Sequence, residues 1–135
     1  MTLLVAINLG GLAIIAADKK EVLIQDGEIY PLHESAEKII DTGIGLITGS
    51  GYVSLLHDVK TEVSNETISN TDQILSIILR NREAIQRNLF LNENQKSQLL
   101  DKTGWLLSYR TIVDELPKLR VVFGVNLCGL PTCQQ

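Results

Sequence analysis

Two apolar segments joined by a pair of glycines constrain the fold of this chain more than any other feature. The segments 2–9 and 12–18 are rich in branched apolar residues, and Gly10 and Gly11 separate them. Two glycines between two such runs are a strong signal for a tight β-hairpin. Because apolar residues are nearly continuous along both segments, we expect both faces of this hairpin to be covered, in an internal layer of the fold.

Strand patterns continue through the first half of the chain. Apolar residues on both sides of Asp26 and Gly27 predict a second, shorter hairpin with its turn at these two residues. A further apolar segment, 44–48, predicts a strand that ends in the glycine-containing sequence 49–51. The first half is therefore expected to consist mainly of strands.

Helical patterns dominate the second half. Residues 52–63 place apolar side chains at helical spacing. Asn70 with Gln73 three residues later has the pattern of a capping box, in which the side chain of each residue accepts a hydrogen bond from the backbone N–H of the other. The apolar stripe that follows predicts one buried helix face, formed by Ile74, Ile77, Ile78, Ile85 and Leu89.

A third helix is predicted to begin at Asn94 or Ser97 and to end before Pro117, which cannot continue a helix. Residues 119–125 then predict a final strand. The order of strands, helices and strand indicates a single α+β layered domain over residues 1–135. The inward side chains of the third helix would be Leu99, Leu100, Leu106, Leu107 and Val113.

Composition and charge limit the classes of function. With a net charge of -4 and no basic stripe, the chain lacks the surface expected of a nucleic-acid-binding protein. No apolar run approaches the roughly 20 residues of a membrane span, so no membrane partner is expected. The apolar N-terminus lacks the basic start and the small-residue cleavage site of a secretion signal, and we therefore expect a cytoplasmic protein.

The two cysteines, Cys128 and Cys133, lie close together near the C-terminus. A structural zinc site usually has four ligands, and only His33 and His57 are available to complete one. We therefore expect a reduced cysteine pair, no metal site and no cofactor.

The second residue of the chain gives the first indication of chemistry. If Met1 is removed, Thr2 carries a hydroxyl and a free amine on the same residue. This arrangement combines a nucleophile with its own base, and it is one of the known ways to activate a threonine. The second apolar segment ends on a carboxylate, that of Asp18.

Taken together, these features resemble the front half of a proteasome β-type N-terminal-nucleophile hydrolase. Thr2, an apolar strand, a short turn and a second strand ending in Ala16-Ala17-Asp18 are similar to the opening of that family. The segment 36–40 resembles the family's segment with the essential lysine, and 44–51 resembles its glycine-containing strand end before the first long helix. The resemblance covers roughly residues 2–63.

The resemblance implies a layered αββα sandwich, apparently truncated because relatives continue into a second half. It also implies a threonine peptidase or amidohydrolase that acts on a peptide or protein substrate, assembled as a homo-oligomer or with a partner subunit. In such an enzyme the Thr2 hydroxyl would attack a peptide carbonyl. Lys38 would hold positive charge beside that hydroxyl, Asp18 would orient Lys38, and the Gly49 backbone N–H would donate to the developing oxyanion.

Non-catalytic explanations remain open for these residues. Asp18 ends a strand pattern at a turn, Lys38 is of a type usually found on the surface, and Gly49 precedes a helix where a turn is expected. If these explanations hold, we expect the chain to be a non-catalytic scaffold or regulatory binding subunit related to the family, or an unrelated partner-binding protein. A scaffold of this kind should expose a large apolar surface, because part of a sandwich leaves a sheet face or edge uncovered.

Overall fold

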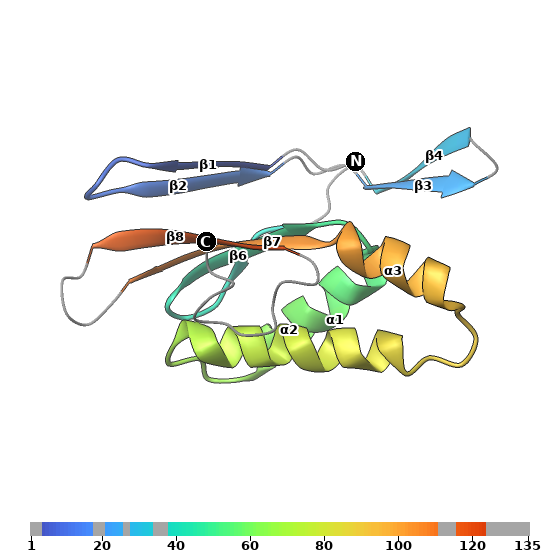
Figure 1. Cartoon of the computed structure of the whole chain (residues 1–135). Helices are drawn as coiled ribbons and strands as arrows, with labels where there is room; N and C mark the ends of the chain where they lie inside the picture. Colours follow the sequence, from blue (N-terminus) through green and yellow to red (C-terminus); the bar gives the residue numbers. More distant parts are fainter. Residues whose placement is uncertain (1–3, 18–20, 26–27, 34–37, 111–115, 124–135) are drawn as a thin grey trace.

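The computed structural model describes residues 4–17, 21–25, 28–33, 38–110 and 116–123. Their strands form three antiparallel sheets, accompanied by three helices (Figure 1). The strands are β1 (Leu4–Asn8), β2 (Ala13–Ala17), β3 (Glu21–Gln25), β4 (Glu28–His33), β5 (Ile40–Asp41), β6 (Gly45–Ser50), β7 (Gly104–Arg110) and β8 (Pro117–Phe123). The helices are α1 (Val53–Asn65), α2 (Thr71–Gln86) and α3 (Glu93–Asp101).

The elements are arranged in layers around a four-stranded sheet. This sheet has the strand order β5-β6-β7-β8, and α1 and α2 cover one of its faces (Figure 1). The β1–β2 hairpin lies on the other face, where both of its strands contact β8. The class is α+β, as the sequence predicts, and among the described residues the layers are helices, sheet and hairpin.

The predicted first hairpin is confirmed. Its strands pair from Leu4 with Ala17 to Asn8 with Ala13. The turn is closed by a 2.8 Å bond from the Leu9 N–H to the carbonyl of Leu12. The second predicted hairpin is confirmed as well, with β3 paired to β4; its turn at residues 26–27 lies outside the described residues.

The expected burial of the β1–β2 hairpin on both faces is wrong. Leu4, Ala6 and Ile15 are partly buried, whereas Val5, Ile7 and Ile14 are 44–45% exposed. Side chains alternate between the two faces of a strand, so the first set faces β8 and the second faces away from the sheet. The hairpin is therefore an outer layer of this structure, with a bare apolar face.

Local sequence signals set the starts of the helices. The capping box of α2 is formed by Asn70 and Gln73, and a second box formed by Asn92 and Gln95 begins α3. Leu89 does not belong to the buried stripe, because α2 ends at Gln86. The apolar core between helices and sheet includes Ile47, Leu55, Leu56, Val59, Val63, Ile74, Leu75, Ile77, Ile78, Leu100, Trp105, Leu107 and Val122.

The predicted length of the third helix is wrong. Helix α3 ends at Asp101, and the apolar residues from Gly104 onward form β7, in the middle of the sheet between β6 and β8. A short apolar run fits a buried strand as well as a buried helix, and here pairing with distant strands decides between them. Pro117 begins β8, a position where a strand tolerates a missing N–H donor. Val113 lies outside the described residues.

The packing of α1 against the sheet depends on Gly49. A Cβ atom at this position would lie 2.6 Å from Cδ2 of Leu56, and 2.9 Å from both Cε3 of Trp105 and the carbonyl oxygen of Gly104. These distances are below any normal van der Waals contact. A side chain at position 49 would therefore push α1 or β7 away from β6.

We expect Gly49→Ala to lower the free energy of unfolding by about 1–3 kcal/mol, because the core must shift to admit one methyl group. Chemical denaturation monitored by circular dichroism measures this change. Gly11→Ala is the matched control, since a Cβ at Gly11 meets nothing within 4 Å. Equal stability of the two variants would contradict the packing role of Gly49.

A buried threonine joins the beginning of α1 to the end of α3. The hydroxyl of Thr103 accepts a 2.9 Å bond from the Tyr52 N–H at the start of α1. It donates a 2.8 Å bond to the Leu99 carbonyl in the last turn of α3. Nearby, the guanidinium of Arg82 donates to the Leu100 carbonyl over 3.1 Å. Burial lowers the pKa of Arg82 from its ordinary value, and the Asp101 carboxylate opposes this change.

Thr103→Val is expected to destabilise the fold by about 1–3 kcal/mol, because it keeps the side-chain shape but leaves the Tyr52 N–H and the Leu99 carbonyl without this partner. Thermal and urea unfolding measure the loss. The same substitution at exposed Thr61 should change stability by no more than about 0.5 kcal/mol. Similar losses at both positions would show that the hydroxyl of Thr103 has no special role.

Candidate functional site

Two of the four residues predicted to form a catalytic site are described by the structure. Lys38 and Gly49 are described, whereas Thr2 and Asp18 lie outside the described residues. Leu4 and Ala17, the described residues nearest to them in sequence, pair with each other at the open end of the β1–β2 hairpin.

Lys38 is buried. It precedes β5 and is only 7% exposed, so it does not belong to the solvated surface. Lysine is among the residue types least often found inside a protein. The explanation of Lys38 as an ordinary surface lysine is therefore wrong.

The strand register relates Lys38 to Gly49. Ile40 of β5 pairs with Ile47 of β6 in antiparallel orientation. Lys38 comes two residues before Ile40 and Gly49 comes two residues after Ile47, just beyond this pairing. Both residues therefore belong to the same corner of the sheet, where β5 begins and β6 ends.

The backbone of Gly49 is directed toward the β5 side of β6. The Arg110 N–H donates to the carbonyl of Ile44, the residue before β6. Because hydrogen bonding alternates along an antiparallel strand, the backbone groups of residues 46, 48 and 50 are also directed toward β7. The backbone groups of residues 45, 47 and 49 are directed to the other side of the strand, toward β5. The hydrogen bond from the Thr42 N–H to the Gly45 carbonyl shows this direction. Gly49 belongs to this second set, and its N–H is therefore directed away from β7 and toward the side of Lys38.

A lysine ammonium group and a backbone N–H that is not taken up by strand pairing both favour negative charge nearby. In a catalytic site, such groups stabilise the oxyanion that forms when a carbonyl is attacked. The close packing at position 49 by itself accounts for glycine there, whatever its N–H does. The evidence for chemistry at this corner therefore comes from the burial of Lys38.

A feature that the sequence analysis missed lies between α2 and α3. Leu89 and Phe90 are 95% and 96% exposed, although both are large and apolar. We call residues 88–91 the Leu89–Phe90 turn. Asn88 and Asn92, on either side, could have indicated this turn from the sequence, because asparagine is typical of turns and helix N-caps.

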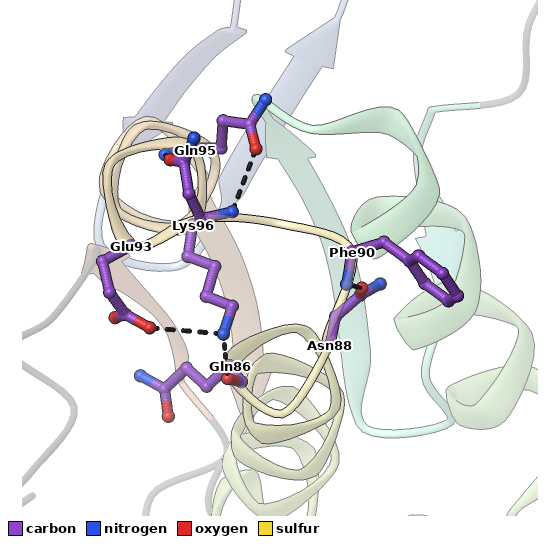
Figure 2. Close-up of polar contacts among 7 residues, drawn as sticks. Gln86, Asn88, Phe90, Glu93, Gln95 and Lys96 are labelled. Carbon is purple, nitrogen blue, oxygen red and sulfur yellow. Dashed lines mark hydrogen bonds and ion pairs between the residues drawn. The ribbon is translucent and has the colours of Figure 1, made fainter.

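Hydrogen bonds hold the backbone of the Leu89–Phe90 turn in place (Figure 2). The Phe90 N–H donates to Oδ1 of Asn88 over 2.8 Å. Nζ of Lys96 donates to the Gln86 carbonyl over 2.7 Å and lies 3.3 Å from the carboxylate of Glu93, which ties α3 to the end of α2. The turn therefore presents two apolar side chains to solvent from a well-defined backbone.

A groove of about 380 Å³ follows the second half of α1 next to β5. Its lining offers hydroxyl, amide, imidazole and ammonium groups, and no carboxylate. It lies toward the opposite end of α1 from Gly49, and one of its lining residues, Ile40, begins β5. The lining residues are Ile40, His57, Lys60, Thr61, Ser64 and Asn65.

Metal binding and membrane spanning were searched over the described part of the chain. Within it, no group of three or more His, Cys, Asp and Glu side chains is arranged to hold a metal ion. Cys128 and Cys133 lie outside the described residues. None of the described helices has the length and apolar character needed to cross a membrane.

No family model, curated protein or solved structure matches the chain. Function is therefore inferred from the residues themselves. Among the described residues, the candidate site consists of the buried Lys38 and the N–H of Gly49 at the corner formed by β5 and β6.

The burial of Lys38 predicts slow chemical modification. During brief treatment with an amine-acetylating reagent, Lys38 should react at least about tenfold more slowly than exposed Lys102, because the reagent must reach the ammonium group. Peptide mass spectrometry measures both rates. In denatured protein the two rates should converge. Equal rates in the native protein would contradict the burial of Lys38.

Proposed function

We propose that this protein is an amidohydrolase of the N-terminal-nucleophile type, in which Thr2 attacks the carbonyl of a peptide bond. The observation that carries the proposal is the burial of Lys38 at the corner where β5 begins and β6 ends, near Gly49 in the pairing of the two strands. The layers of helices, sheet and hairpin are compatible with three of the four layers of an αββα sandwich. The sequence resemblance over residues 2–63 supports the same assignment.

The proposed reaction starts from Thr2 with a free amine, and so requires removal of Met1. An α-amine has a pKa of about 7.7–8.0, so a fraction is neutral near physiological pH and accepts the proton of the Thr2 hydroxyl, directly or through water. The hydroxyl oxygen then attacks the substrate carbonyl, and the proton passes to the leaving amine. Water hydrolyses the resulting ester and regenerates Thr2.

Three further groups support this reaction in the proposal. The ammonium group of Lys38 holds positive charge beside the Thr2 hydroxyl and favours its deprotonated form. Asp18 orients and neutralises Lys38. The Gly49 N–H donates to the oxyanion of the tetrahedral intermediate, a contribution that can reach several kcal/mol for one donor. No cofactor takes part in this scheme.

A threonine-directed covalent probe tests this proposal. Intact mass spectrometry of the protein should show loss of Met1 and one adduct at Thr2. Thr2→Ala should abolish the adduct, whereas Thr2→Ser should retain it because it keeps both the hydroxyl and the amine. Lys38→Met should slow labelling by at least about a hundredfold, and Lys102→Met should leave the rate unchanged.

Two outcomes would rule out catalysis by Thr2. One is undiminished labelling of Thr2→Ala. The other is a folded, Met1-free protein that never reacts with the probe. Circular dichroism of each variant separates loss of the reaction from loss of the fold.

A second candidate function is a non-catalytic scaffold or binding subunit. The observation that favours it is the bare outer face of the β1–β2 hairpin, where Val5, Ile7 and Ile14 are exposed. Exposed apolar faces of this kind are typical of contact surfaces between proteins. A chain that fails to react with the probe but associates through this face would fit the second function.

A further inference from the structure

Phe90 is the most exposed large apolar residue of the segment 38–110. Its side chain is 96% exposed, and that of its neighbour Leu89 is 95% exposed. The other aromatic residues of this segment are covered, since Trp105 is buried and Tyr52 and Tyr109 are partly buried. In the segment 38–110, Phe90 is therefore the one aromatic side chain that another protein reaches in full without a change of fold.

The Leu89–Phe90 turn is too small for a stable contact between two proteins. An interface of standard size buries about 800 Å² on each partner, from about 20 to 30 residues. Asn88 and Asn92 stand on either side of the turn and are polar, so the apolar surface ends there. Such a turn fits a pocket for a single large apolar side chain. Endopeptidases select their substrates with a pocket of this kind, and exposed loop tips are preferred sites of cleavage.

We propose that the Leu89–Phe90 turn is a processing site, cut by an endopeptidase that selects a large apolar residue. The bond that breaks is the peptide bond between Phe90 and Leu91. One water molecule is consumed: its hydroxyl group completes a carboxyl group on Phe90, and its remaining hydrogen completes an amine on Leu91. The products are the segments 1–90 and 91–135. The proposal is independent of the reaction proposed for Thr2.

The backbone around Phe90 has to open before it is cut, because an endopeptidase acts on a locally opened chain. The beginning of α3 loses little burial on opening, since residues 93–98 are exposed except for Lys96. The buried residue of α3, Leu100, lies near the other end of the helix. An element with so little burial opens locally while the rest of the fold stays intact.

Lys96 ties the two ends of the turn together (Figure 2). Its side chain is only 12% exposed, and its Nζ donates a 2.7 Å bond to the Gln86 carbonyl and lies 3.3 Å from the carboxylate of Glu93. Gln86 is the last residue of α2, so this bond joins α3 to α2 across the turn. Loss of the ammonium group is therefore expected to favour the open turn.

The tip of the β1–β2 hairpin also exposes large apolar residues, Leu9 and Leu12. There the two strands are paired up to the turn, which the bond from the Leu9 N–H to the Leu12 carbonyl closes. Opening this backbone breaks strand pairing, whereas residues 88–92 belong to no strand. The Leu89–Phe90 turn is therefore expected to be cut before the hairpin tip.

The cut leaves the four-stranded sheet in one piece. Strand β6 belongs to the first product, and it pairs from Gly45 to Ser50 with β7 of the second product. Strand β7 also pairs with β8. The two products are therefore expected to stay associated after the cut.

Limited digestion of the purified full chain with chymotrypsin, which selects large apolar residues, tests the proposal. Peptide mass spectrometry should find the bond after Phe90 cut before any other bond of residues 38–110 and before the hairpin tip. The two products should elute together in native size-exclusion chromatography and separate only on a denaturing gel. An earlier cut elsewhere in these segments would overturn the proposal, as would products that separate under native conditions.

Substitutions at the turn test the role of its side chains. Leu89→Ser combined with Phe90→Ser should slow cutting of the turn at least about tenfold, because both side chains that fit the pocket are removed. Val53→Ser, at another exposed apolar residue, should leave the rate unchanged. An undiminished rate in the double serine variant would overturn the proposed site.

A substitution at Lys96 tests what holds the turn closed. Lys96→Met should speed cutting at least about threefold, because it removes the bond to the Gln86 carbonyl. Lys102→Met, at an exposed lysine, should leave the rate unchanged. Thermal unfolding of each variant shows that it is folded at the temperature of the digestion. An unchanged rate in Lys96→Met would contradict the role of Lys96.

Discussion

The close approach of α1 to the sheet at Gly49 is the contact on which the rest of this structure depends. The absence of a side chain there leaves room for Leu56 and Trp105, both of which approach Gly49 closely. This contact sets the distance between the helical layer and the sheet around which the apolar core forms. The hydroxyl of Thr103, the residue before β7, holds the beginning of α1 close to this contact.

The corner of the sheet that holds this contact is also where a charged side chain is buried. Burial of a charge is costly unless other groups compensate for it. Arg82, which is likewise buried, is held by a backbone carbonyl at the end of α3, and its role in joining two helices is clear. Lys38 is also buried, just before β5, and this burial marks the corner as the candidate site.

Part of the candidate site is contained in the sequence and part is not. The resemblance pointed to Lys38 and Gly49 from residue type and order alone. Their common position follows only from the register of β5 on β6, which hydrogen bonds between separate segments determine. The exposure of Leu89 and Phe90 was not predicted. Apolar residues at helical spacing do not show where the helix ends, and Leu89 continues the spacing beyond the end of α2.

The sequence by itself determined the elements whose signals are local. The glycine pair defined the first hairpin, the capping box defined the start of α2, and the order of elements defined the α+β class. The tertiary structure decided that residues 104–110 form a strand and that the hairpin has one covered face. The reason is physical: capping and turn geometry depend on neighbouring residues, whereas strand pairing and burial depend on segments far apart in the chain, which apolar periodicity alone does not specify.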